Sequence, residues 1–317
     1  MPEFLQDLSP EARMGLLVLG VLVLASVVAA ILRIAKPDKD FKELIARIRA
    51  WWVMASVFFL AVALSDKLSI IFFALMSFWA LKEYITLLET RPADHGALVL
   101  VFLAVPVQFY WVWTEWYGMF VIFIPVYMFL ALPVRMMMAR ETTGFVASVS
   151  QIHWGLMAFV FGLSHMAYLL TEPGPADSGA NGRTLVLFLV FVVEMSDIFQ
   201  YCWGKAIGKH RVIPAVSPNK TWEGLIGGIA TTMLVSLLIR FLTPFSIGET
   251  LVVVLIITVA GFFGGAVMSC IKRDFGVKDF GTLIPGHGGM LDRVDSLCFA
   301  APIFYHYMLF YHLGSGG

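Results

Sequence analysis

The order of apolar and polar residues divides the chain into long apolar runs that are separated by short polar connections. A helix needs roughly 20 apolar residues to cross about 30 Å of hydrocarbon, and most of the runs approach that length. The runs are Met14–Leu32, Trp51–Leu64, Leu68–Leu81, Ala97–Thr114, Trp116–Val134, Thr142–Thr171, Thr184–Trp203, Gly224–Ile239, Leu251–Ile271 and Ser296–Leu313. The pattern therefore predicts an all-α polytopic membrane protein with about ten transmembrane helices.

Three segments near the N-terminus leave a choice between structures. Trp51–Leu64 and Leu68–Leu81 are short, so they form either two tight spans or one re-entrant hairpin. Arg33–Arg49 is basic and has apolar residues at helical spacing, which favours a surface helix in contact with anionic headgroups. The residues before Met14–Leu32 are acidic rather than basic, so we expect this run to remain a span and not a cleaved signal peptide.

Composition narrows the class of protein further. Of the 317 residues 59% are hydrophobic and only 14% are charged, whereas soluble chains carry roughly 25% charged residues. The mean hydropathy of +0.84 excludes a soluble enzyme, a disordered chain and a nucleic-acid binder. Cys202, Cys270 and Cys298 lie in or beside apolar runs without paired spacing, which favours neither a disulfide framework nor a zinc site.

The positive charges are distributed unequally between the two sides of the membrane. If the runs alternate in direction, eighteen of the 22 Lys and Arg residues fall on one face. Cytoplasmic connections are enriched in Lys and Arg, so we expect that face to be cytoplasmic and both termini to lie outside. We interpret residues 1–170 as a region of N-terminal transmembrane helices and 171–317 as the catalytic region, since the unusual polar residues collect in the latter.

The first cluster of unusual residues starts inside a predicted span. Glu194 and Asp197 are three residues apart and share one face of a helix. Carboxylates at membrane depth are costly and usually face a cavity with a function, although a water-exposed pair at the end of a span is the alternative. The segment Ser217-Pro218-Asn219-Lys220-Thr221 then precedes the next span. Hydroxyls, a turn and a lysine at a helix N-terminus predict an anion site.

The second cluster, residues 269–295, combines four cations, four carboxylates and a glycine-rich turn. Asp292 and Asp295 are one helical turn apart and can converge on one cation, as paired carboxylates do around Mg²⁺. Lys272, Arg273 and Arg293 can neutralise phosphate charge. The pattern predicts a site for a Mg²⁺–nucleoside triphosphate at a membrane surface. A basic loop that merely obeys the positive-inside rule explains the Lys and Arg residues but not the Pro-Gly-His-Gly-Gly turn.

The order of residues in this second cluster resembles a known signature. It reads Ser-x-x-Lys-Arg, Lys-Asp, Pro-Gly-His-Gly-Gly and Asp-Arg-x-Asp between Ser269 and Asp295. This is similar to the phosphatidate cytidylyltransferase (CDP-diacylglycerol synthase) family, and the stretch from Asp197 to Gly224 resembles the family's other shared block. The resemblance covers roughly the last 130 residues. It implies an enzyme of phospholipid biosynthesis that condenses CTP with phosphatidate to CDP-diacylglycerol and pyrophosphate at the bacterial inner membrane.

The resemblance also suggests roles for individual residues, cofactors and partners. We expect Lys272, Arg273, Lys220 and His287 to act on the reacting phosphates, His287 as a hydrogen-bonding residue of the loop, with a general acid as the alternative role. The expected metal ligands are Glu194, Asp197, Asp292 and Asp295, for Mg²⁺ with or without a second, monovalent cation. The expected substrate-binding residues are Ser217, Asn219, Thr221, Ser269, Lys278, Gly286, Gly288, Gly289 and Arg293. Partners would be CTP, phosphatidate or a related lipid phosphate, the bilayer and a second copy in a homodimer.

The chain departs from the family's pattern at three positions. Family members commonly carry Asp and Glu where this chain has Gly265 and Met268, and a small residue where it has Gln200. Two alternatives therefore stay open. One is a CTP-dependent kinase of a polyprenol- or phytol-type lipid, and the other is a catalytically impaired membrane paralogue with a binding role.

Overall fold

A computed structural model describes residues 8–36, 40–175, 179–284, 286 and 288–313, and they are predominantly helical. The elements are α2 (Pro10–Ala35), α3 (Lys42–Leu64), α4 (Asp66–Leu87), η1 (Pro92–Asp94), α5 (His95–Trp113), α6 (Tyr117–Ile122), η2 (Phe123–Met128), α7 (Phe129–Met137), α8 (Phe145–Gly155), η3 (Leu156–Gly162), α9 (Leu163–Thr171), α10 (Gly182–Ile207), β1 (Arg211–Ile213), β2 (Ser217–Thr221), α11 (Trp222–Ser236), η4 (Leu237–Leu242), α12 (Ile247–Asp274), α13 (Leu291–Val294), α14 (Leu297–Met308) and η5 (Leu309–Leu313). The predicted all-α polytopic fold is confirmed.

Nine helices within the described ranges are long and apolar enough to cross a membrane. They correspond in order to the first nine predicted runs. The tenth predicted run, Ser296–Leu313, is helical as α14 and η5, and this helical segment is shorter than the nine membrane-length helices. The re-entrant alternative is wrong, because α3 and α4 are two full-length helices and Ser65 caps the second of them through the Leu68 amide at 3.2 Å.

Two local expectations need correction. The basic stretch before residue 50 is not a separate surface helix, because α3 begins at Lys42 and continues unbroken to Leu64. Apolar residues at helical spacing suit the first turns of a span as well as a surface helix, so the pattern alone does not separate the two. The segment before α11 forms a small antiparallel pair, β1 with β2, which the all-α prediction did not include.

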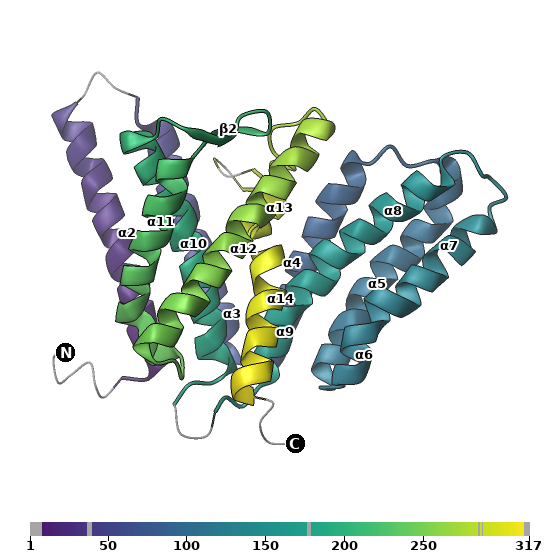
Figure 1. Cartoon of the computed structure of the whole chain (residues 1–317), viewed down its shortest axis with the longest axis horizontal. Helices are drawn as coiled ribbons and strands as arrows, with labels where there is room; N and C mark the ends of the chain where they lie inside the picture. The colour runs from purple at the N-terminus through teal and green to yellow at the C-terminus, as the bar shows by residue number, and fades with distance from the viewer. Residues whose placement is uncertain (1–7, 37–39, 176–178, 285, 287, 314–317) are drawn as a thin grey trace.

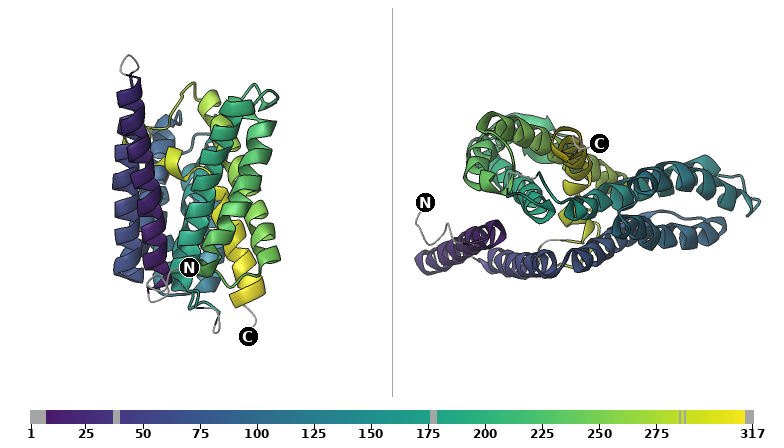
Figure 2. Two further views of the ribbon diagram at one scale, coloured as in Figure 1. Left: turned by 90° about the vertical axis from the view of Figure 1, so that its left-hand side faces the viewer. Right: turned by 90° about the horizontal axis from the view of Figure 1, so that it is seen from below.

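The helices form an elongated, two-layered bundle (Figures 1 and 2). Seen from below in Figure 2, α2, α3 and the helices that follow run along one side, and the α10–α12 group lies across from them. The β1–β2 pair lies at one end of the bundle, α2 starts and α14 ends toward the other, and α13 lies nearer the middle (Figure 1). The segments that carry the predicted chemistry thereby lie between one end of the bundle and its middle.

Glycines allow α10 and α11 to pack closely beside this end. A Cβ atom added to Gly228 of α11 would lie 2.7 Å from the backbone nitrogen of Gln200 on α10. Small residues that let helix backbones approach are typical of membrane interfaces. The close packing of α10 on α11 fixes Asp197, which precedes Gln200 by one turn, relative to β2.

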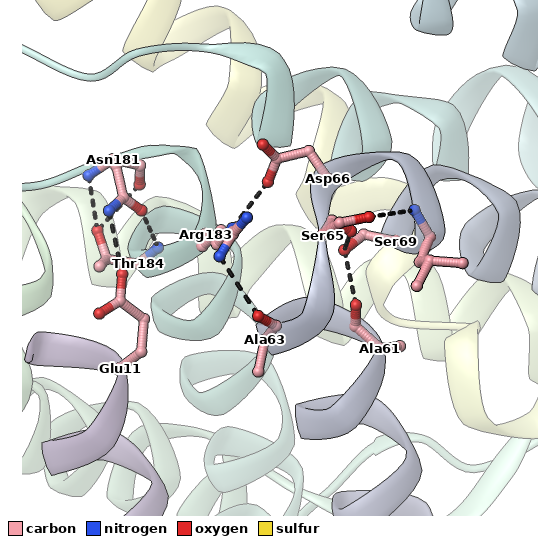
Figure 3. Close-up of polar contacts among 10 residues, drawn as sticks. Glu11, Ala61, Ala63, Ser65, Asp66, Ser69, Asn181, Arg183 and Thr184 are labelled. Carbon is pink, nitrogen blue, oxygen red and sulfur yellow. Dashed lines mark hydrogen bonds and ion pairs between the residues drawn. The ribbon is translucent and has the colours of Figure 1, made fainter.

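The opposite end of α10 is tied to the first helices by polar contacts (Figure 3). Asn181 accepts a hydrogen bond from the Thr184 amide at 3.0 Å and donates one to Glu11 of α2 at 3.0 Å. Arg183 pairs with Asp66, at the start of α4, at 2.7 Å and also reaches the carbonyl oxygen of Ala63. These contacts hold α10 against α2, α3 and α4.

Candidate functional site

A polar cavity of about 1110 Å³ lies at the end of the bundle where the predicted clusters meet. Residues from both halves of the chain line it, including Arg47 and Trp51 of α3 and Tyr201 of α10. The cavity gathers most of the predicted site: Glu194, Asp197, Asn219, Lys220, Thr221, Ser269, Lys278, Gly286, Gly288, Asp292, Arg293 and Asp295. The two sequence clusters thus form one site.

We call the side of the cavity that Asp197 of α10, Asp295 after α13 and Lys220 of β2 line the helical wall. Its two carboxylates share a serine. Ser296 Oγ donates a hydrogen bond to Asp197 Oδ2 at 3.0 Å, and the Ser296 amide donates to Asp295 Oδ1 at 2.7 Å. Burial raises the pKa of the Asp295 carboxyl, because the charged form loses hydration. Each carboxylate keeps a second oxygen without a hydrogen bond to any described residue, which leaves it available to a ligand.

Lys220 brings a positive charge to the same wall. Its Nζ atom lies 4.5 Å from the ring centroid of Phe262 and 3.4 Å from that residue's carbonyl oxygen. Burial lowers the pKa of the Lys220 ammonium, whereas the charges of Asp197 and Asp295 act in the opposite direction. No carboxylate of the described residues lies within 4.0 Å of this ammonium, so it can accept an incoming anion.

Gly265 lies where these groups converge. A Cβ atom at this position would be 3.2 Å from Lys220 Nζ, 3.3 Å from Ser296 Oγ and 3.9 Å from Asp295 Oδ2. The side chain of any larger residue would therefore enter the polar cavity. Met268, a second of the three departures, is fully buried and belongs to the apolar core.

Asp292 is used differently from the carboxylates on the helical wall. Its Oδ1 pairs with Lys272 Nζ at 2.9 Å, and its Oδ2 accepts from the amides of Phe280 and Gly289 at 2.8 and 2.9 Å. The predicted convergence of Asp292 with Asp295 is not visible, because Asp292 points into the glycine-rich loop and holds it. We call residues 279–284, 286 and 288–290 the glycine loop.

The glycine loop folds back on itself in front of α13. The Ile284 amide donates to the Gly288 carbonyl at 2.8 Å, and Gly286 and Gly288 have φ angles of 76° and 80°. Only glycine adopts such left-handed conformations without strain, which explains the residue type at both positions. Gly286 and Gly288 of the loop line the cavity, as does Lys278 directly before it.

Some predicted residues lie away from the cavity lining. Lys272 lies behind Asp292, and Arg273 is exposed and donates to the carbonyl of Val216 at 3.3 Å. Ser217 and Gly289 belong to β2 and the glycine loop but do not line the cavity. The prediction for His287 falls outside the described residues.

A second, apolar cavity of about 430 Å³ adjoins the first. It runs between α2, α3, α4 and α10, with Met14, Phe59 and Phe72 toward the far end of the bundle. Glu194 and Arg293 line both cavities. The Arg293 Nε atom is buried and makes no hydrogen bond with the residues that the structure describes. A cation is thereby placed where an apolar space meets a polar one.

The carboxylates suit a metal that arrives with its substrate. Across the described residues, no three His, Cys, Asp or Glu side chains form a ready metal site. Mg²⁺ in proteins is often held by only one or two carboxylates together with substrate phosphates and water. The oxygens of Asp197 and Asp295 that face the cavity fit that incomplete set.

Comparisons with known proteins identify the family of the chain. The sequence profile described as "Cytidylyltransferase family" matches residues 45–311. The chain is 41% identical over 290 residues to Uncharacterized protein YnbB of Escherichia coli, which covers 91% of this chain and 95% of that protein. It is also 30% identical over 259 residues to a phosphatidate cytidylyltransferase of Staphylococcus haemolyticus, covering 79% of this chain and 94% of that protein.

Proposed function

Because the chain belongs to the cytidylyltransferase family, we propose that it condenses CTP with phosphatidate to give CDP-diacylglycerol and pyrophosphate. One observation carries the choice of a lipid acceptor: the polar cavity and the apolar cavity meet at Glu194 and Arg293. A substrate with a phosphate at one end and hydrocarbon at the other fits this junction.

The depth of the apolar cavity supports a lipid that lies in one leaflet. Along α10 its lining extends from Leu187 to Ile198. Eleven residues of helix rise about 16 Å, which is close to half of the roughly 30 Å hydrocarbon core. We place one acyl chain there and the lipid phosphate at Arg293.

The proposed reaction needs positioning more than acid–base chemistry. A phosphatidate oxygen is already an anionic nucleophile, and it attacks the α-phosphorus of CTP. The bond from that phosphorus to the oxygen bridging it to the β-phosphorus breaks, and pyrophosphate leaves with the electron pair. Lys220 would neutralise charge on the triphosphate, while the glycine loop orients it from the opposite wall.

Residues of the helical wall would hold the proposed Mg²⁺. Asp197 and Asp295 offer cavity-facing oxygens, with Glu194 further along α10 and Asp292 behind the glycine loop. Bound Mg²⁺ would offset the negative charge of the triphosphate oxygens. A second cation and a homodimer stay predictions.

The site belongs on the cytoplasmic side in this proposal. The face that carries eighteen of the 22 Lys and Arg residues includes the β1–β2 pair and the glycine loop. CTP is made in the cytoplasm, so an inner-membrane protein with this orientation would meet its substrate. A cysteine accessibility assay on the variants Lys209→Cys and Lys278→Cys tests the orientation. Labelling of the Lys278→Cys protein only from outside would contradict the proposed enzymatic function.

The deciding experiment supplies purified protein with phosphatidate and CTP labelled in the cytidine or the γ-phosphate. A cytidine label in the lipid product with release of pyrophosphate supports the proposal. A γ-phosphate label in an added polyprenol, with release of CDP, would instead identify a lipid kinase. CTP binding without any product would identify an impaired paralogue, consistent with Gly265 and Met268.

A further inference from the structure

Glu83 of α4 contacts the glycine loop from the first half of the chain. It is almost fully buried, and its two carboxylate oxygens point at the start of α13. Oε1 accepts a hydrogen bond from the Met290 amide at 3.0 Å, and Oε2 accepts one from the Leu291 amide at 2.8 Å. The partners are separated by more than 200 residues in sequence, so the contact joins the two halves.

Two glycines of the loop are shaped around this carboxylate. A Cβ atom at Gly289 would lie 2.3 Å from Glu83 Oε2, and one at Gly281 would lie 2.7 Å from Oε1. Neither glycine has a left-handed φ angle. Their small size is therefore explained by the closeness of Glu83, unlike that of Gly286 and Gly288.

Glu83 and Asp292 hold the same loop from two sides. Asp292 binds the amides of Phe280 and Gly289, and Glu83 binds the next two amides, those of Met290 and Leu291. Three consecutive backbone N–H groups thus donate to carboxylates. Hydrogen bonds to an ionised acceptor are roughly twice as strong as neutral ones, so the loop is fixed at this point.

We propose that Glu83 is a positioning residue for the nucleotide, because its hydrogen bonds to Met290 and Leu291 fix where the glycine loop lies relative to the polar cavity. Glu83 is not among the residues that line this cavity, so it acts through the loop rather than on substrate. The inference rests on the proposed function for the identity of the nucleotide, but the contact between Glu83 and the loop can be tested without turnover.

The test compares Glu83→Gln with Glu89→Gln, a change of an exposed carboxylate beyond the end of α4. A glutamine keeps the size of the side chain but turns an N–H donor toward one of the two amides. Hydrogen exchange at Met290 and Leu291 should become about tenfold faster in Glu83→Gln, with little change in α12 or α14. The Glu89→Gln protein should exchange as the unsubstituted protein does.

Kinetics then separates positioning from general destabilisation. The KM for CTP should rise by about tenfold in Glu83→Gln, while the KM for phosphatidate and the monodispersity in detergent stay unchanged. Unchanged exchange at both amides would overturn the contact. Faster exchange with an unchanged KM for CTP would overturn the positioning role. If the unsubstituted protein does not use CTP, the proposed function fails, and the exchange result alone decides whether Glu83 holds the loop.

A double substitution provides a check that survives poor folding of one variant. Gly289→Ala should speed exchange at Met290, since its methyl group meets the Glu83 carboxylate. In Glu83→Ala/Gly289→Ala that obstacle is gone, so the second change should add less than about twofold to the effect of Glu83→Ala alone. Full additivity of the two effects would contradict the fit of Gly289 to Glu83.

Discussion

Polar residues at the start of α10 and polar residues further along the helix are used in opposite ways. At its start, Asn181 and Arg183 find partners within the protein, in Thr184, Glu11 and Asp66 (Figure 3). Toward its other end, Glu194 and Asp197 line the polar cavity, and Asp197 has a protein partner on only one of its oxygens. Polar groups whose partners are complete support structure, whereas incomplete ones indicate where a ligand belongs.

The largest expected effect is on CTP turnover, and it distinguishes Asp197 from Asp66, which pairs with Arg183 at the start of α10. Asp197→Asn keeps the shape of the side chain and its contact with Ser296 but removes a charge that faces the cavity. Turnover of CTP should fall by about a hundredfold or more with little change in thermal stability. Asp66→Asn, the matched change at the other end, should leave turnover intact. Equal activity of both variants would show that the cavity carboxylate is not used.

The next effect concerns the buried ion pair under the glycine loop. The side chains of Lys272 and Asp292 are only 15% and 3% exposed. Asp292→Asn leaves the ammonium buried without its partner, and breaking such pairs costs about 3–5 kcal/mol. Urea unfolding of the detergent-solubilised protein should therefore show a clear loss of stability together with the loss of activity. An unaltered unfolding midpoint would contradict the role of Asp292 in holding the loop.

A smaller and more informative effect is expected at Gly265. The atoms nearest to an added Cβ, Lys220 Nζ and Ser296 Oγ, end flexible side chains and can shift. Gly265→Asp should therefore fold and place a third carboxylate beside Asp295. We expect the Mg²⁺ concentration for half-maximal activity to fall by about threefold to tenfold. A raised KM for CTP with an unchanged Mg²⁺ requirement would instead show that the new carboxylate captures Lys220.

The smallest effect is expected for the ion pair at the start of α10. Arg183 and Asp66 are partly exposed, and such pairs contribute about 0.2–1 kcal/mol. Arg183→Ala should lower the unfolding free energy by no more than that and leave CTP turnover unchanged. A loss of several kcal/mol in the same unfolding assay would mean that the Arg183–Asp66 pair contributes as much to stability as the buried Lys272–Asp292 pair.

The sequence predicted the spans, and most of the residues that it indicated for a candidate site line one cavity. Apolar runs of membrane length report directly on helices, and the clusters around Asp197 and Asp295 indeed line one cavity. The direction of a side chain was not predictable in the same way. Asp292 and Asp295 are one turn apart, yet the amides of Phe280 and Gly289 draw the first of them into the loop.

Glu83 had no signal in the sequence that pointed to the site. It stands alone near the end of a span, where a carboxylate is unremarkable, and its partners are backbone amides rather than side chains. Backbone groups leave no trace in residue type. Only the unexplained small size of Gly281 and Gly289 hinted at a neighbour, and locating that neighbour required the fold.

The junction of the two cavities has a consequence for how a catalytic cycle would end. In the proposed reaction, one product is a small, highly charged ion and the other remains attached to hydrocarbon. Pyrophosphate can leave through the polar cavity, which Arg47 lines. The lipid product must instead move laterally into the bilayer from the apolar cavity, which Met14 of α2 and Phe59 of α3 line. The two products would leave into different solvents, so the viscosity of the bilayer, and not only that of water, would set the pace of release.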